Sequence, residues 1–249
     1  LKNKITILKP FWGQRIGSKS RIEANIKLPN IKSAKFAEFY GIMLGDGCVY
    51  STMSGLCISS NSIVDRHYNT QYISNLILDL FGIKPKIYYS KKEKVVKSVL
   101  YSKKITKFMV DFGFPKGKKI YGNTRIPNKF FNNLSLLKSC MRGLHDTDGT
   151  ICPHPHTKIM LNISIIAKPL LKSSIKAFKT LKIPIGHYDK GLNLYGKEKI
   201  DNYFNSIGSS NMKHVLKYKT FINDGYVPDT KEIEKTLKSK DGELDEKLP

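Results

Sequence analysis

Acidic residues are scarce in this chain of 249 residues. The 20 Asp and Glu residues face 43 Lys and Arg residues, which leaves a formal net charge of +23. A charge of this size indicates a polyanionic partner, with nucleic acid first and an anionic membrane surface second. A composition rich in Lys and Asn, as AT-rich genomes encode, contributes to the excess but does not by itself leave so few acids.

Long apolar runs are also missing. No stretch approaches the roughly 18 residues of a membrane-spanning helix, and no signal peptide is visible. The chain has four cysteines and no CxxC pair among them: Cys48, Cys57, Cys140 and Cys152. A reduced, intracellular protein is the simplest interpretation. Cys152 lies near His154 and His156, but the segment CPHPH lacks the ligand spacing of a known closed zinc site.

Two similar stretches of nine residues stand out, FYGIMLGDG at 39–47 and MRGLHDTDG at 141–149. Each is a helix-like run with one interior glycine, Gly41 or Gly143, and each ends in an Asp-Gly pair. The separation between the two glycines equals the separation between Asp46 and Asp148. Two ordinary turns ending two core helices would explain either stretch alone, but the in-phase repeat favours a paired site.

The repeated pattern has a physical interpretation. An interior glycine destabilises a helix, and it is tolerated where another backbone must approach closely. Two helices packed through Gly41 and Gly143 would bring their C-terminal ends together. Asp46 and Asp148 would then repel each other at the unfavourable end of both helix dipoles. A divalent cation resolves this conflict, and carboxylate oxygens suit Mg²⁺.

Both stretches resemble the LAGLIDADG motif of homing endonucleases. The second stretch matches five of the motif's letters, with Gly143, Leu144, Asp146, Asp148 and Gly149. The first keeps Gly41, Asp46 and Gly47 and has Leu44 at the sixth letter. Two motifs in one chain resemble the monomeric, two-motif members of the family, and the resemblance covers about residues 30–223.

The resemblance implies a staggered double-strand cut in a long DNA target, made by a monomer with Mg²⁺ or another divalent ion such as Mn²⁺. It implies that Asp46 and Asp148 hold the metal, and that the backbone carbonyls of Gly45 and Thr147 add ligands. Hydrolysis of phosphodiesters is chemistry that such ions support.

Family members often place a basic side chain near each scissile phosphate. Aligning the Phe-Gly and Ile-Gly junctions that end the two halves pairs Lys118 with Lys213, the best candidates for this role. A lysine that contacts phosphates without a part in cleavage is the plain alternative for each. In some relatives a polar residue follows the second strand. The comparable positions here are Ser60-Asn61 and Ile165-Ile166, which predicts a bias toward nicking one strand.

The order of turn and periodicity signals predicts an α+β fold of two pseudo-symmetric αββαββα halves. Each half would contain a four-stranded antiparallel sheet, and the two motif helices would pack the halves into a DNA-binding saddle. Helices are expected over 34–44, 61–81, 103–112, 135–146, 168–181 and 197–207. Strands are expected over 48–50, 55–60, 86–89, 95–101, 150–152, 159–165, 186–188 and 192–195.

The predicted domain organisation divides the chain into five parts. These are a basic N-terminal arm at 1–30, a first half at 31–113, a linker at 114–133, a second half at 134–223 and a tail at 224–249. The tail mixes acids with lysines, and we expect it to be mobile or to form a short exposed helix.

The outer strand faces carry side chains that can read base edges in a major groove. In the first half these are Ser59, Lys91, Lys92, Lys94 and Lys97. In the second half they are His154, His156, Lys158, Asn162, Ser164, His187, Lys190 and Asn193. The lysines at 91–97 would mostly meet phosphates. A solvated strand face is the plain alternative for any one of them.

Two alternatives to a DNA endonuclease remain open. One is an RNA maturase that binds its own intron on the same fold. Unpaired bases stack on exposed aromatics, but we expect most of the candidate tyrosines to pack inside, namely Tyr50, Tyr88, Tyr89, Tyr101, Tyr188 and Tyr195. The other is a DNA-binding regulator that does not cleave. The expected location is with the host genome, in an organelle matrix or a prokaryotic cytoplasm.

Overall fold

The computed structural model describes residues 25–119 and 123–245, with side chains to residue 238. Most of the predicted basic arm therefore lies outside the described residues. The elements of the first half are α2 (Ala34–Gly45), β1 (Gly47–Val49), β2 (Leu56–Asn61), η1 (Tyr68–Ile73), α3 (Ser74–Phe81), β3 (Lys86–Ser90), β4 (Val95–Leu100) and α4 (Lys103–Asp111). Helix α5 (Asn128–Phe131) precedes the second half. There follow α6 (Leu134–Asp148), β5 (Gly149–His154), β6 (Lys158–Ser164), α7 (Lys168–Thr180), β7 (Gly186–Tyr188), β8 (Gly191–Tyr195), α8 (Lys197–Ser206), α9 (Met212–Asp224) and α10 (Thr230–Asp245).

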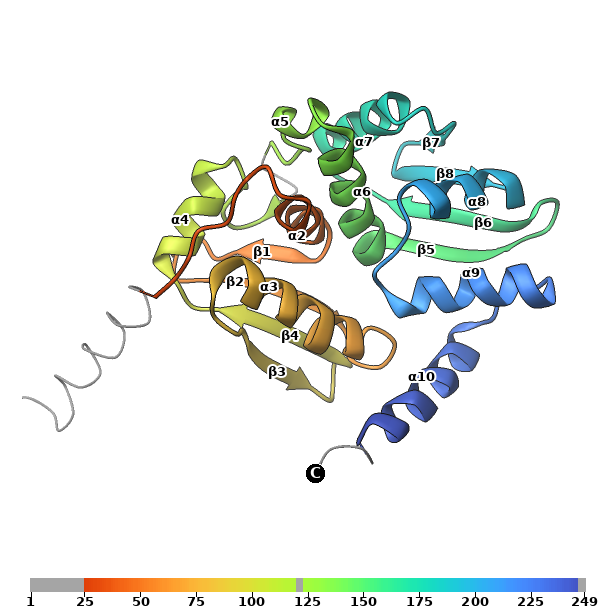
Figure 1. Cartoon of the computed structure of the whole chain (residues 1–249), viewed down its shortest axis with the longest axis horizontal. Helices are drawn as coiled ribbons and strands as arrows, with labels where there is room; N and C mark the ends of the chain where they lie inside the picture. Colours follow the sequence, from red (N-terminus) through yellow and green to blue (C-terminus); the bar gives the residue numbers. More distant parts are fainter. Residues whose placement is uncertain (1–24, 120–122, 246–249) are drawn as a thin grey trace, which may run out of the picture.

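The two halves have the same sheet topology. The first sheet has the order β1-β2-β4-β3 and the second the order β5-β6-β8-β7, with antiparallel pairing throughout. Figure 1 shows the two sheets on either side of the helix pair α2 and α6. The predicted α+β fold of two similar halves is confirmed. Within the described ranges, no helix combines the length and the apolar character needed to cross a membrane.

Helices α2 and α6 form the centre of the molecule and touch through their glycines. A Cβ atom on Gly41 would lie 2.0 Å from the Cys140 carbonyl oxygen, and one on Gly143 would lie 2.2 Å from the Glu38 carbonyl oxygen. Each helix begins at a side-chain cap, because Ser33 accepts from the Phe36 amide and Asn133 accepts from the Ser135 amide. The two helices therefore run side by side with their C-terminal ends together.

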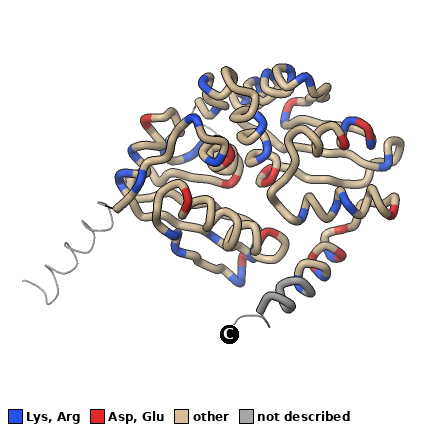
Figure 2. Tube along the Cα trace, viewed as in Figure 1, with Lys and Arg blue, Asp and Glu red and all other residues tan. Residues whose placement is uncertain are grey.

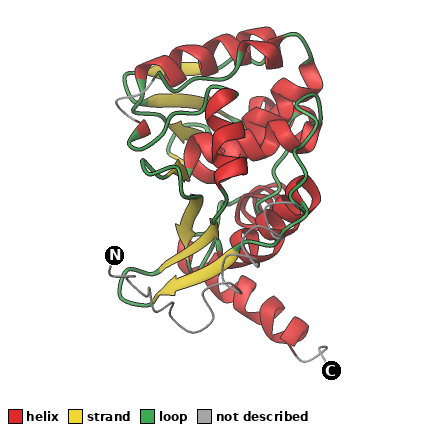
Figure 3. Cartoon of the chain, turned by 90° about the vertical axis from the view of Figure 1, so that its left-hand side faces the viewer, coloured by secondary structure: helices red, strands yellow, loops and turns green. Residues whose placement is uncertain are grey.

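The sheets and the helices form separate layers. Figure 3 shows the strands along one side of the molecule and most of the helices on the other. Strand β6 illustrates the alternation, because Ile159, Leu161 and Ile163 are fully buried while Asn162 and Ser164 face outward. The apolar face of each sheet supports the helix layer, and the polar face stays open.

The structure differs from the sequence-based prediction after β2. A continuous helix over 61–81 was expected, but the Asn61 side chain accepts from the Ile63 and Val64 amides and starts a turn. Helical residues 66–67 then lead into the π-helix η1, where the buried Asn69 donates to the Ser60 hydroxyl at 2.8 Å. Anchoring Asn69 to the sheet fixes the wide turn of the π-helix, and a regular helix follows only from Ser74.

The C-terminal segment also differs. Helix α9 was not predicted, and the tail contains the 16-residue helix α10. Ile233 and Leu237 on α10 are 2% and 9% exposed, so this helix packs against the body through an apolar edge. Of the two expectations for the tail, a helix is confirmed, but it is longer than expected and its Ile233 and Leu237 side chains are buried.

Candidate functional site

The site begins where α2 and α6 end. Asp148 is the last residue of α6, and Asp46 follows the last residue of α2 as its C-cap. A Cβ atom on Gly45 would lie 1.9 Å from the Thr147 hydroxyl oxygen and 3.3 Å from the Asp148 carboxyl carbon. The glycine therefore lets the two helix ends touch and sets two half-buried carboxyl groups at one place.

Burial and mutual repulsion perturb both carboxyl groups. Burial raises the pKa of Asp46 to about 7, and the neighbouring carboxylates of Asp148 and Asp65 add to the rise. Burial also raises the pKa of Asp148 to about 6. The ammonium group of Lys119 opposes both shifts. Near neutral pH Asp46 is therefore partly protonated while Asp148 is mostly ionised, so a bound cation would have to displace a proton from Asp46.

Lys119 reaches the end of α2. Its Nζ donates to the carbonyl oxygens of Leu44 at 2.9 Å and Met43 at 3.2 Å, and also to that of Gly45. Burial lowers the pKa of this ammonium group, and the two site carboxylates oppose the fall. A positive group at the negative end of the helix dipole is favourable. Lys119 thus places a positive charge on the carbonyl of Gly45, one of the predicted metal ligands.

The structure adds Lys119 to the predicted lysine pair, and the role of Lys118 beside a scissile phosphate stays a prediction. The side chain of Lys118 is exposed, and the lysine at the carboxylates is Lys119, one residue later. Lys213 lies at the site, where its Nζ is 2.8 Å from Asp65 Oδ1 and its side chain is 17% exposed. Both Lys119 and Lys213 lower the pKa of Asp46. Counting residues from a glycine junction could not fix the rotation of the segment that follows.

A buried network that the sequence analysis missed joins the two halves beside the site. Asn211 donates to Asp65 Oδ1 at 2.7 Å and to the Asp146 carbonyl oxygen at 3.0 Å. Asp146 in turn accepts from the Ser210 amide at 2.7 Å. The carboxylate at the sixth letter of the second motif therefore holds the start of α9, whereas the eighth-letter Asp148 lies at the paired helix ends.

Glu38 forms a second link between the halves. Its carboxylate accepts from the hydroxyls of Tyr72 and Ser210, each at 2.7 Å, and pairs with Arg142 of α6. The Glu38 side chain is 3% exposed. A buried carboxylate with three partners fixes the relative placement of α2 and α6. No short motif in the sequence pairs residues this far apart.

Comparison with known proteins identifies the fold. No protein-family model and no curated protein matches the sequence. The full-length DUF199/WhiA from Thermatoga maritima is similar over 89% of this chain and 71% of that chain, with a TM-score of 0.51 and 17% identity. The N-terminal domain of DUF199/WhiA is described as a LAGLIDADG domain. The chain has a LAGLIDADG-type fold.

Two further solved structures are similar at lower TM-scores. The N-terminal LAGLIDADG domain of DUF199/WhiA has a TM-score of 0.49 and 17% identity, covering 82% of this chain and 96% of that chain. I-DmoI in complex with DNA and Mn has a TM-score of 0.47 and 19% identity, covering 73% of this chain and 99% of that chain. At these identities the likeness concerns the fold.

In this LAGLIDADG fold the first sheet carries the predicted lysines at its rim. The side chains of Lys91, Lys92 and Lys94 in the β3–β4 turn are exposed, as is that of Lys97 on β4. Strand pairing sets half-buried Ser59 opposite Lys97. Figure 2 shows Lys and Arg positions spread over both halves, with Asp and Glu positions at the centre, along α10 and at a few places on the periphery.

The second sheet of the LAGLIDADG-type fold presents a connected polar face. Asn162 donates to Asn193 Oδ1 at 2.5 Å, and Ser164 donates to Asn162 Oδ1 at 3.2 Å. His154 accepts through Nδ1 from the Thr157 amide at 3.2 Å. The remaining predicted residues of this face are exposed, namely His156, Lys158, His187 and Lys190. Their role in base contact stays a prediction.

The expectation that most of the candidate tyrosines pack inside was wrong. Five of the six have exposed side chains, at 45% for Tyr88, 55% for Tyr89, 52% for Tyr101, 43% for Tyr188 and 38% for Tyr195. Tyr88 and Tyr89 are neighbours on β3, so their side chains point to opposite faces of the sheet, yet both are exposed. Strand alternation alone would place one of them inside, and the position of β3 at the sheet edge explains why both are exposed.

The residues that follow the second strand are polar in the first half and apolar in the second, as the sequence analysis noted. Ser60 is 8% exposed and accepts from Asn69, while the Asn61 side chain caps the following turn. Ile165 is buried and Ile166 is 66% exposed. The polar pair of the first half makes local hydrogen bonds, the second half has isoleucines at these positions, and the bias toward nicking stays a prediction.

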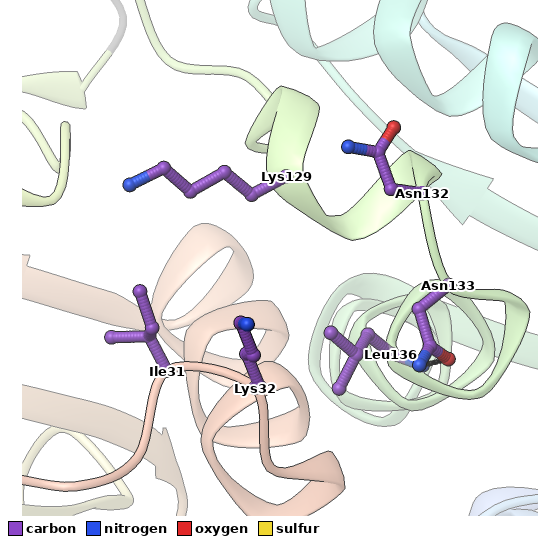
Figure 4. Close-up of a pocket in the computed structure, with 6 residues that line it drawn as sticks. All are labelled: Ile31, Lys32, Lys129, Asn132, Asn133 and Leu136. Atoms are coloured by element: carbon purple, nitrogen blue, oxygen red, sulfur yellow. Dashed lines mark hydrogen bonds between the residues drawn. The ribbon is translucent and has the colours of Figure 1, made fainter.

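The hollow drawn in Figure 4 lies at the opposite end of the helix pair. It has a volume of about 350 Å³ and is lined by Ile31, Lys32, Lys129, Asn132, Asn133 and Leu136. These residues lie near the N-terminal ends of α2 and α6, whereas the carboxyl groups lie at the C-terminal ends. We assign the hollow no part in the site.

Proposed function

We propose that the protein is a site-specific endonuclease that cleaves double-stranded DNA with a divalent metal ion. The observation that carries this proposal is the pairing of Asp46 and Asp148 at touching helix ends, with the pKa of each raised. Perturbed acids of this kind are frequent at functional sites. The net charge of +23 and the two open polar sheet faces supply a surface for a polyanion.

The donor set fits a hard cation. Asp46 and Asp148 would hold it through carboxylate oxygens, and the carbonyls at the ends of α2 and α6 supply further oxygens. Repulsion between the carboxylates of Asp46 and Asp148, and the attraction of both for the Lys119 ammonium group, favour positive charge at this place once the carboxyls ionise. When bound, the ion would polarise a phosphodiester and activate a water molecule for its hydrolysis.

The protein's own groups have separable roles in this proposal. Asp46 and Asp148 ionise fully only above about pH 7 and pH 6, respectively. Lys119 and Lys213 lower the pKa of Asp46 and offer positive charge to a phosphate. The sheet faces would hold the duplex, with the lysines at 91–97 on phosphates and the asparagine and histidine side chains of the second sheet toward bases.

A cleavage selection tests the proposal. A library of duplexes is incubated with the full chain in Mg²⁺, beside Asp46→Asn, Asp148→Asn and the matched surface control Asp79→Asn, whose carboxylate pairs with Lys35 at 51% exposure. We expect one defined cut site, cleaved by the wild type and the control and by neither site variant. Cleavage that survives in both site variants would contradict the assignment.

A DNA-binding protein that does not cleave is the second candidate. The position of Lys119 favours it, because its ammonium group already covers the Gly45 carbonyl that a metal would use. The exposed tyrosines keep the intron-RNA alternative open as well. Selective binding of one duplex without a cut in Mg²⁺ or Mn²⁺ would favour the DNA-binding protein that does not cleave. Preference for a folded intron RNA would favour the RNA maturase.

A further inference from the structure

Two histidines and an aspartate meet inside the second half, away from the paired carboxyl ends. His145 of α6 and His214 of α9 are both 0% exposed, and Asp146 is 1% exposed. The two imidazole rings are 4.5 Å apart between centroids, and His145 Nδ1 lies 3.6 Å from Asp146 Oδ1. One ligand atom from each of the three residues lies within 4.8 Å of the other two.

The two imidazoles are poorly hydrogen-bonded. Within the described residues, neither nitrogen of His145 or of His214 meets a partner at hydrogen-bond distance and angle, and only the Asp146 backbone acts on His214, against the effect of burial on its pKa. A neutral imidazole carries one donor and one acceptor, and each group left unpaired in the interior costs about 1–3 kcal/mol. An apolar pair would join α6 and α9 better than two unsatisfied rings. A ligand bound by the imidazole nitrogens would satisfy these unpaired groups.

The ligand atoms of the His145, Asp146 and His214 cluster differ in chemistry from those of the paired aspartates. Burial holds the pKa of His214 well below its usual range, and the nearby His145 acts in the same direction, so the ring is neutral with a free lone pair. Neutral imidazoles and one carboxylate suit zinc and related transition metals, whereas oxygen donors suit Mg²⁺. Asp146 also accepts from the Ser209 hydroxyl and the Ser210 amide, which orients its carboxylate.

We propose that His145, Asp146 and His214 bind a transition-metal ion, zinc by preference, at a structural site separate from Asp46 and Asp148. A tetrahedral shell with bonds of about 2 Å sets ligand atoms roughly 3.3 Å apart. The three ligand atoms lie within 4.8 Å of one another, so metal binding requires the imidazole rings to move closer to the Asp146 carboxylate. Tyr203, whose ring lies 5.1 Å from that of His145, brings a further buried hydroxyl without a partner among the described residues.

The site would fasten α9 to the motif helix. Lys213 directly precedes His214 and reaches Asp65, which raises the pKa of Asp46. Holding His214 therefore fixes the lysine on one side of the paired carboxyls. The zinc site does not depend on the nuclease proposal, because it is defined by its own ligands and is read out by metal binding.

The test uses the full chain freed of metal by a chelator, with Zn²⁺ alone as the probe. We expect one equivalent of tightly bound Zn²⁺ in competition with a chromophoric chelator, and visible absorption bands of tetrahedral Co²⁺ after substitution. The melting temperature should rise by roughly 5 °C or more when free Zn²⁺ is about a hundredfold above its dissociation constant.

Two variants and two controls locate the ion. His214→Leu and His145→Leu keep the interior filled without an unpaired polar group, so they are expected to fold and to bind Zn²⁺ at least ~100-fold more weakly. Asp148→Asn and the double variant His154→Gln/His156→Gln should bind it as the wild type does. No Zn²⁺ bound by the wild type, or binding lost in either control but kept in His214→Leu, would overturn the proposal.

Discussion

Replacing Asp148 by Asn should stabilise the metal-free protein. The pKa of Asp148 rises from its usual 3.8 to about 6, and burial is the main cause. The folded protein therefore resists ionisation of this group, and the charged form costs folding free energy above pH 6. A difference of about two pH units corresponds to roughly 3 kcal/mol at pH 8. Partial exposure and screening reduce the expected gain to about 1–3 kcal/mol.

The stability gained by Asp148→Asn depends on pH. The penalty is complete above the folded pKa of about 6, and it disappears as the pH falls toward the unfolded value of 3.8, because the folded protein then takes up the proton. The gain from Asp148→Asn should therefore be largest at pH 8 and small near pH 4. Adding Mg²⁺ should reduce or reverse it, because only the wild type supplies both carboxylates to the ion.

Urea denaturation in EDTA at pH 8 and pH 4 measures this effect. The matched control is Asp111→Asn, which removes an exposed carboxylate paired with Lys107 and should change the free energy of unfolding by less than about 0.5 kcal/mol. A loss of stability in Asp148→Asn at pH 8 without metal would refute the reasoning. It would mean that attraction to Lys119 outweighs the cost of burying the carboxylate.

Three further predictions follow from named contacts. Lys119→Met should slow cleavage roughly 100-fold and move the acid limb of its pH profile to higher pH, since Lys119 holds down the pKa of Asp46, whereas Lys118→Met should leave the profile in place. Gly41→Ala should destabilise by about 3 kcal/mol or more in urea titrations, because its Cβ would meet the Cys140 carbonyl oxygen at 2.0 Å, and an unchanged midpoint would contradict the helix contact. Arg142→Met should cost about 3 kcal/mol by leaving the Glu38 carboxylate buried and unpaired, and a neutral result would show that Tyr72 and Ser210 suffice.

Sequence periodicity was enough to predict the repeated half. Alternation in β6 and the Ser33 and Ser102 caps are local features, and the structure has each of them. The π-helix η1 could not be predicted, because it depends on Asn69 bonding to Ser60 and Ser98 on neighbouring strands. A helical window contains no information about such partners.

Helix α9 was missed because its buried face is polar. The inward residues are His214, Lys217 and Phe221, with Lys217 donating to the Ile151 carbonyl oxygen at 3.0 Å. A hydrophobic-period search passes over a helix whose buried face includes a histidine and a lysine. The Asn211 cap, which accepts from the Lys213 amide, was the local signal that could have revealed it.

The same helix explains why the two halves differ at the site. Matching the glycine junctions sets Lys119 opposite His214 in the duplicated pattern. Lys119 points to the end of α2 and carries a charge to the carboxyls, whereas His214 turns inward against His145. The second half supplies its charge from the adjacent Lys213 through Asp65. One position of the repeat thus serves the paired aspartates in the first half and the proposed metal site in the second, and a sequence offset alone cannot separate these two roles.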